Sequence, residues 1–198
     1  MTRVIAGQAG GRRLAVPPGR DTRPTSDRAR EGLFATIASL AGPLAGARVL
    51  DLYAGSGAVG LEALSRGAGQ AERLDVLLDD LAGAGRGLDQ EHVPGAEVVT
   101  DRVERVLARG PAGGRYDVAF ADPPYARPDA EVSRMLACLT KRDWLAPGAL
   151  MIIERATRSG PLTWPDGFEA DRSRRYGEAT FWYGLARPIN IVGEPRKG

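Results

Sequence analysis

The sequence predicts an α/β fold with a mostly parallel sheet whose last strand runs antiparallel. Short apolar runs of strand length alternate with stretches of helical spacing, a pattern that builds a parallel sheet covered by helices. The first of these runs turns directly into glycines and a helix, and the last two are joined by a Gly-Glu pair typical of a hairpin turn. The 198 residues, of which 43% are hydrophobic and 26% charged, suit one domain with a short appendage.

Local patterns place the individual elements. A first helix is expected from a cap at Thr25 or Ser26 to Leu40, because apolar residues recur there at helical spacing, and Gly42 and Pro43 end it. The last residues, 187–198, are rich in Pro, Gly and Arg and predict a disordered tail. The other expected elements are a strand at 48–53, a helix at 61–66, strands at 96–99 and 116–121, a helix at 131–139, a strand at 149–154, and a closing hairpin of 172–176 and 179–185.

The composition excludes several classes of protein. The N-terminus lacks the apolar segment of a signal peptide and no run approaches the ~18 apolar residues of a membrane span, so we expect a cytoplasmic protein. One cysteine, Cys138, and one histidine, His92, leave no disulfide and no His/Cys cluster, so no metal is expected.

The first thirty residues are strongly basic. They hold seven arginines against only Asp21 and Asp27, a distribution typical of segments that contact phosphates. A solvated arm that only aids solubility is the alternative for an isolated basic run. The candidates for RNA binding are Arg12, Arg13, Arg23, Arg28 and Arg30.

A glycine-rich loop follows the first predicted strand. The segment Asp51-Leu-Tyr-Ala-Gly-Ser-Gly-Ala-Val-Gly60 lets a ligand approach backbone amides at a helix N-terminus. Its glycine spacing alone fits NAD and S-adenosylmethionine equally well. The acid at the strand end, Asp51, favours S-adenosylmethionine, whose ammonium group it would support. The cofactor candidates in this loop are Asp51, Tyr53, Ala54, Gly55 and Gly57, and Asp101, just past a later strand, is a candidate for contact with the adenine.

A second motif, Asp122-Pro123-Pro124-Tyr125, follows the apolar strand at 116–121. It should lie at the same edge of the sheet as the glycine loop, because both follow parallel strands. An exocyclic amine of a base is a poor nucleophile, and Asp122 with a prolyl carbonyl can accept its hydrogens while holding the nitrogen in line with a methyl donor. The prolines stiffen the loop and Tyr125 offers a face on which the base can stack. Together the two motifs predict methyl transfer to a base amine, with these four residues as the catalytic set.

Four segments in order, residues 3–14, 22–34, 51–67 and 122–125, resemble the RsmD-type bacterial 16S rRNA guanine-N2 methyltransferases, over nearly residues 1–186. The resemblance implies a Rossmann-like, seven-stranded methyltransferase sheet, S-adenosylmethionine as cofactor, and guanine N2 as acceptor within an assembling small ribosomal subunit. It also implies a basic hairpin and helix (1–42) that dock the rRNA, ahead of a methyltransferase domain (43–186). We expect a monomer.

One stretch, Gly69 to Pro94, departs from the family, which would place a buried strand ending in an acid here. A strand starting at Ala71-Glu-Arg-Leu74 is too polar for the middle of a sheet, and three glycines would weaken a helix after it. Asp75 stands near the position of the acid that would hold the cofactor ribose, and is the remaining cofactor candidate.

An in-frame inversion of the encoding DNA is our hypothesis for this departure. Reverse-complemented codons for Leu88 to Pro94 can encode Gly-His-Val-Leu-Leu-Val-Glu, and those for Gly69 to Val76 can encode Asn-Val-Glu-Ala-Leu-Gly-Leu-Pro. The first reading is a hydrophobic strand ending in an acid. Sequencing the gene tests the hypothesis, which fails if an uninverted reading frame here matches close relatives.

Three other functions remain open on the sequence. A DNA adenine-N6 methyltransferase uses the same tetrad, although the short chain shows no separate DNA-recognition domain. An NAD-dependent oxidoreductase leaves the tetrad unexplained, and a cofactor titration would separate it. A catalytically impaired RNA-binding homologue is favoured if residues 69–94, as written, abolish cofactor binding.

Overall fold

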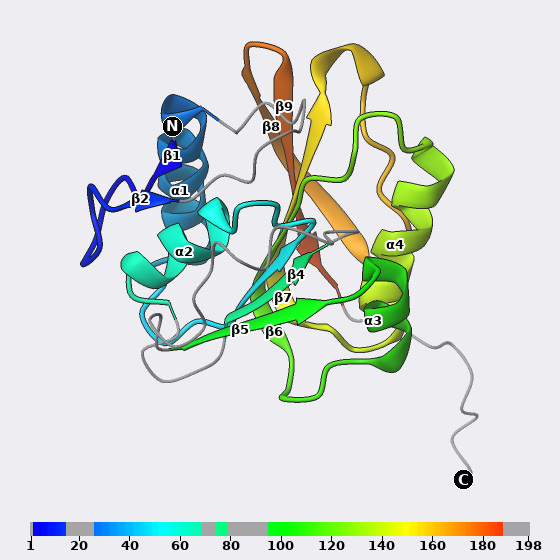
Figure 1. Ribbon diagram of the computed structural model, residues 1–198. Coiled ribbons are helices and arrows are strands. Elements are labelled where there is room, and N and C mark those ends of the chain that lie inside the picture. The colour runs from blue at the N-terminus through cyan, green and yellow to red at the C-terminus, as the bar shows by residue number, and fades with distance from the viewer. Residues whose placement is uncertain (1, 15–25, 69–73, 79–94, 188–198) are drawn as a thin grey trace, which may run out of the picture.

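The computed structural model describes residues 2–14, 26–68, 74–78 and 95–187 (Figure 1). The predicted tail lies outside these residues, apart from Arg187. In chain order the elements are β1 (Thr2–Arg3), β2 (Arg13–Leu14), α1 (Asp27–Ala41), β3 (Val49–Leu52), α2 (Ala58–Ser65), β4 (Leu74–Leu78), β5 (Ala96–Thr100), α3 (Val103–Arg109), β6 (Tyr116–Ala121), α4 (Asp129–Lys141), β7 (Leu145–Ala156), a 3₁₀ turn (Thr157–Ser159), β8 (Phe168–Tyr176) and β9 (Ala179–Ala186).

The main sheet has seven strands in the order β5-β4-β3-β6-β7-β9-β8. The strands from β5 to β7 are parallel, and β9 runs antiparallel to both of its neighbours. This confirms the predicted α/β class and the closing hairpin. Because β3, β6 and β7 are parallel neighbours, their carboxyl ends meet at one edge of the sheet.

Helices cover both faces of the sheet, with α1 and α2 on one side and α3 and α4 on the other (Figure 1). Leu33, Phe34 and Ile37 of α1 pack in one core cluster with β6 and β7, and Val132 and Leu136 of α4 pack in the other. The Ser26 hydroxyl accepts from the Ala29 amide, which confirms one of the two expected caps. Among the described residues, no helix is long and apolar enough to span a bilayer.

The β1–β2 hairpin is bound to α2 by hydrogen bonds. The buried carboxylate of Glu62 accepts from the amides of Ile5 (2.5 Å) and Ala6 (3.0 Å), and Ser65 Oγ accepts from the Ala9 amide (2.9 Å). Gly7 has a φ of 84°, and a Cβ there would lie 1.9 Å from the Ser65 carbonyl oxygen. The N-terminal hairpin is therefore held against α2.

The strand β4 corrects one expectation from the sequence. The stretch judged too polar for a central strand does supply one, but it begins at Leu74, and it lies between β3 and β5. Three residues of β3 and five of β5 pair with it. Its last three residues are apolar, which suits a strand with neighbours on both sides.

Candidate active site

The glycine loop connects the end of β3 to the start of α2. The backbone has positive φ at Tyr53 (60°), Gly55 (58°) and Gly57 (70°), which turns the chain sharply, and only Tyr53 pays the steric cost of a side chain there. Gly57 is the cap residue of α2, and Ala54 accepts its amide through the backbone carbonyl at 2.7 Å. The loop therefore presents backbone amides at a helix N-terminus, as predicted.

Asp51 holds this loop and keeps one carboxylate oxygen available. Its Oδ2 accepts from the Gly60 amide at 2.9 Å, while Oδ1 has no hydrogen-bond partner among the described residues. Burial raises the pKa of Asp51 to about 7, against a smaller opposing effect of the Gly60 amide. A buried carboxylate with one unsatisfied oxygen fits a cationic ligand group, such as the ammonium of S-adenosylmethionine.

The Asp122-to-Tyr125 loop lies beside the glycine loop. The Asp122 amide donates to the carbonyl of Leu52, the last residue of β3, at 3.3 Å. Pro123 is buried, Pro124 is exposed, and the Tyr125 side chain is 42% exposed, so its ring is accessible for stacking. The structure thus brings together the two motifs that the sequence placed at one edge of the sheet.

Glu154, on β7, is a site residue that the sequence analysis missed. It is almost fully buried, and the Tyr125 hydroxyl donates to its Oε1 at 3.3 Å. Ala121 and Ile153 are paired in the β6–β7 register, so Asp122 and Glu154 each follow a paired residue. The available signal was an acid at the end of an apolar strand, the same signal that identified Asp51.

Asp51, Asp122 and Glu154 occupy alternating positions that project to the α1 and α2 side of the sheet, together with Val49, Phe120 and Ile152 of that core cluster. Burial, and then the charges of Glu154 and Asp51, raise the pKa of Asp122 well above its usual value. Burial, and then the charges of Glu154 and Asp122, also raise the pKa of Tyr125. We call Asp51, Asp122 and Glu154 the edge carboxylates.

Arg127 joins the two loops on the other side of the sheet edge. Its guanidinium lies 5.1 Å from the centre of the Tyr53 ring and pairs with Glu104, and the Tyr53 hydroxyl lies 3.4 Å from the same carboxylate. Arg127 also pairs with Glu131 at 3.7 Å. The sequence analysis missed Arg127, because no motif includes it and its only signal is its position two residues after Tyr125.

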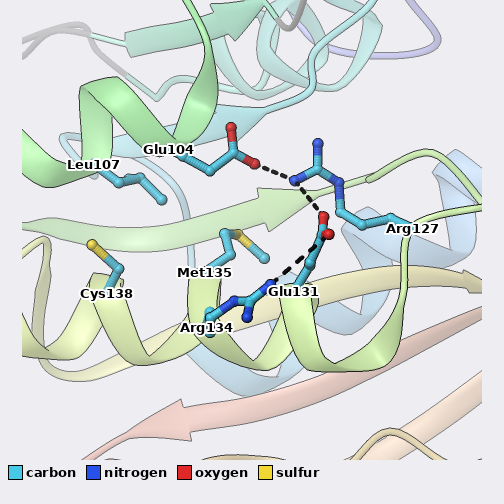
Figure 2. Close-up of a pocket in the computed structure, with 7 residues that line it drawn as sticks. All are labelled: Glu104, Leu107, Arg127, Glu131, Arg134, Met135 and Cys138. Atoms are coloured by element: carbon cyan, nitrogen blue, oxygen red, sulfur yellow. Dashed lines mark hydrogen bonds and ion pairs between the residues drawn. The ribbon is translucent and has the colours of Figure 1, made fainter.

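Below this arginine, a pocket of about 300 Å³ lies between α3 and α4. Figure 2 shows charged side chains at one end of it and Leu107, Met135 and Cys138 at the other. Cys138 is half-buried and packs against the core. Arginines compensate the acids at the rim, so the pocket differs in electrostatics from the site of the edge carboxylates.

Two further cofactor candidates lie away from the edge carboxylates. Asp101, after β5, accepts from the Arg102 amide (2.7 Å) and pairs with Arg109 (2.7 Å), and these partners lower its pKa. Asp75 pairs in register with Leu50 and Glu97, three residues before β4 ends at Leu78. Asp75 therefore does not stand at the strand end, where the resemblance implies an acid for the ribose, because the strand begins later in the chain than expected.

The predicted RNA-binding arginines separate into two kinds. Arg12, Arg13 and Arg28 are exposed on the hairpin and α1, whereas Arg23 lies outside the described residues. Arg30 is fully buried, and its Nη2 donates to the Arg3 carbonyl (2.6 Å) and to Asp27 Oδ1 (2.8 Å). Its assignment to RNA binding is wrong, because the guanidinium joins the hairpin to α1 inside the protein.

Residues 2–184 match the family model described as conserved hypothetical protein 95. The chain belongs to this family. It is 35% identical over 186 residues to the ribosomal RNA small subunit methyltransferase D of Escherichia coli K12, covering 90% of this chain and 87% of that protein. The corresponding Haemophilus influenzae protein of the same name is 32% identical, with 90% and 91% covered. The resemblance to RsmD-type proteins is thereby confirmed.

Solved structures agree with this assignment. The Escherichia coli protein yhhF superposes with a TM-score of 0.77 at 33% identity, covering 94% of this chain and 98% of that one. The rRNA methyltransferase aviRa of Streptomyces viridochromogenes superposes with a TM-score of 0.67 at 16% identity, covering 91% and 92%, a likeness of fold alone. The fold is that of S-adenosylmethionine-dependent methyltransferases, which confirms the predicted fold class.

Proposed function

We propose that this protein transfers a methyl group from S-adenosylmethionine to the N2 amine of a guanine in 16S rRNA. The observation that carries the proposal is the hydrogen bond from the Asp122 amide to the Leu52 carbonyl, which fixes the acceptors of the tetrad next to the cofactor loop. The name shared by the Escherichia coli and Haemophilus influenzae relatives supports small-subunit rRNA as the substrate.

The chemistry assigned to the tetrad is orientation and proton acceptance. S-adenosylmethionine, when bound, supplies an electrophilic methyl group. Asp122 and the Pro123 carbonyl accept the two amine hydrogens, so that the nitrogen lone pair points at the methyl carbon. As the new bond forms, the amine becomes more acidic and one proton passes to Asp122, whose raised pKa makes it a stronger base than an exposed aspartate. Tyr125 stacks on the base.

Cofactor binding is assigned to the glycine loop. Asp51 Oδ1 would accept from the methionine ammonium, and the loop around Tyr53, Ala54, Gly55 and Gly57 would surround the cofactor through its backbone. Asp101 remains the proposed contact for the adenine, with its carboxylate oriented by Arg109. No ribose acid is assigned among the described residues, since Asp75 is not at a strand end.

RNA docking is assigned to two basic surfaces on one side of the sheet. Residues 1–42 would form a docking extension through Arg12, Arg13 and Arg28, and Arg23 belongs to the same proposal, ahead of a methyltransferase domain at 43–186. The edge strand β8 adds Arg172 and Arg174, both exposed. Arg174 is in register with Phe181, and Phe181 with Glu154, so this arginine lies two strands away from Glu154.

Exposed arginines on these surfaces should act through charge. Changing Arg12, Arg13 and Arg28 together to Gln should weaken RNA binding and reduce the salt dependence by about one unit of slope per lost phosphate contact. A matched control is Arg134→Gln on α4, which removes an exposed arginine from the opposite face. Equal losses in both variants would argue against docking through the N-terminal extension.

The proposal includes a monomer that works in the cytoplasm on an assembling small subunit. DNA adenine-N6 methylation is the competing activity, since it needs the same acceptors. Radiolabelled methyl transfer onto small subunits that lack the modification separates the two, with duplex DNA as the second substrate. Label in 16S rRNA supports the proposal. Label in DNA alone contradicts it, and RNA binding without transfer indicates the impaired homologue.

A further inference from the structure

Glu154 is a buried acid whose role the proposed reaction leaves unassigned. Another buried acid, Glu62, is accounted for, because it accepts from two amides of the N-terminal hairpin. Glu154 instead lies near the carboxyl end of β7, two residues before Ala156, beside the strand that leads into the tetrad, and it contacts the Tyr125 hydroxyl. A carboxylate buried next to two others costs free energy, so a functional reason for its presence is expected.

The edge of guanine provides such a reason. Beside the N2 amine, guanine carries an N1–H that also donates, and both hydrogens point in nearly the same direction. A site that holds only the amine leaves this second donor buried without an acceptor, which is costly. Adenine and 2-aminopurine carry a bare, accepting nitrogen at position 1, and a carboxylate there would repel it.

The backbone geometry places Glu154 where a second acceptor is needed. Asp122 and Glu154 follow the paired residues Ala121 and Ile153 on neighbouring strands, and their side chains project to the same face of the sheet. The Tyr125 hydroxyl donates to Glu154 Oε1, which connects the acid to the ring on which the base would stack. Asp122 and Glu154 thus offer two carboxylates side by side.

We propose that Glu154 accepts the N1–H of the target guanine while Asp122 accepts from its N2 amine, so that Glu154 determines the preference for guanine. This proposal rests on the proposed guanine-N2 activity. The charge of Glu154 also raises the pKa of Asp122, which links base recognition to proton acceptance. Binding of a guanine with two donors would relieve the repulsion between the two acids.

The test compares two bases at one position of the RNA. The methylated guanine is first mapped in rRNA by mass spectrometry, and a 16S rRNA fragment is then ligated with guanine or 2-aminopurine at that position. The unaltered protein should prefer guanine by about 100-fold or more in kcat/KM, because a site built to accept a hydrogen rejects the analogue without it. This arm needs no variant.

Glu154→Gln should reverse part of that preference. The Gln carbonyl can still accept from Tyr125, and its amide can donate to the bare nitrogen of 2-aminopurine, so we expect the ratio to fall to about tenfold or less. The apparent pKa of the pH–rate profile should fall as well, since the charge of Glu154 no longer raises the pKa of Asp122. Glu62→Gln is the matched control: it alters an equally buried acid and should leave the ratio unchanged.

The outcomes separate this inference from the proposed function. If the unaltered protein forms no N2-methylguanosine, the proposed function is wrong, and so is the role of Glu154 that rests on it. If it methylates guanine but accepts 2-aminopurine equally well, or if Glu154→Gln keeps the original ratio, only the role of Glu154 is overturned.

Discussion

The two groups of acids in this protein have opposite electrostatics. The edge carboxylates lie at or near the carboxyl ends of β3, β6 and β7. Burial raises the pKa of Asp51, and burial together with the charges of Glu154 and Asp51 raises the pKa of Asp122. On the α3 and α4 side, the pKa values of Asp101 and Glu104 are lowered by hydrogen bonds from backbone amides and then by the arginines that pair with them. The negative charges of the acids at the pocket of Figure 2 are therefore balanced by neighbouring arginines.

This difference indicates which acids perform chemistry. An acid that pairs with an arginine gains modest stability and is held in its charged form, so it is poorly suited to take up a proton from a substrate. The edge carboxylates concentrate negative charge where a cationic cofactor and a hydrogen-donating base edge would bind. Such an arrangement costs stability in the empty protein and favours ligands that supply positive charge or donors.

The largest effect is expected from Asp122→Ala. Removing the proton acceptor should lower kcat for methyl transfer by about 100- to 10,000-fold, the usual contribution of a general base. Thermal stability should be unchanged or higher, because a repelled buried acid is lost. Glu131→Gln, beside Arg127 on the other side of the sheet, is the control and should retain activity. Comparable losses from both changes would remove the distinction between the two groups.

The pH dependence of methylation should report the edge carboxylates. Protonated Asp122 cannot accept the amine proton, and its pKa is raised, so activity should fall as pH falls, well above pH 3.8 where an ordinary aspartate titrates. Initial rates across a pH series measure this directly. Glu104→Gln should not shift the profile. A midpoint near that of a free aspartate would contradict the raised pKa.

Asp51→Asn should stabilise the cofactor-free protein and weaken the binding of S-adenosylmethionine. Because the pKa of about 7 in the folded protein exceeds the ordinary value of 3.8, the native state binds more protons between these pH values and loses stability as pH rises. This difference in pKa corresponds to at most ~4 kcal/mol of stability. Thermal melts should show the variant's advantage growing from pH 4 to 8. An advantage independent of pH would contradict the burial effect.

The smallest effect on stability is expected where an acid pairs with an arginine, as Glu104 does with Arg127. Glu104→Gln and Arg127→Gln should each change the free energy of unfolding by about 1 kcal/mol or less, as for other partly exposed ion pairs. A double-mutant cycle in urea measures their coupling. A coupling of several kcal/mol would show that this side is not merely balanced charge.

Much of the fold could be predicted from the sequence because the patterns that specify it are local. The apolar run before Asp122, the glycines after Asp51 and the Ser26 cap each specify structure within a few residues. The shared location of the two motifs also followed, since parallel strands bring their carboxyl ends to one edge of the sheet. From the sequence, both chemical motifs could be placed at one edge.

What escaped prediction depends on contacts between distant segments. The sequence placed Arg30 among the basic residues that would contact RNA. Its burial depends on the Arg3 carbonyl, 27 positions away in the chain. The sequence placed Glu154 at the end of a predicted strand. Its position beside Asp122 becomes visible only once β7 is paired with β6. The start of β4 at Leu74 was missed because pairing on both sides stabilises a strand with polar residues before it.

The identity of the methylated nucleoside tests the guanine-N2 assignment most directly. Small subunits lacking the modification are labelled with radioactive S-adenosylmethionine, and their RNA is digested and separated by chromatography. The label should migrate with N2-methylguanosine and be absent with Asp122→Ala. Label in N6-methyladenosine, or in a base methylated at a ring atom, would contradict the assignment of the edge carboxylates to the guanine amine.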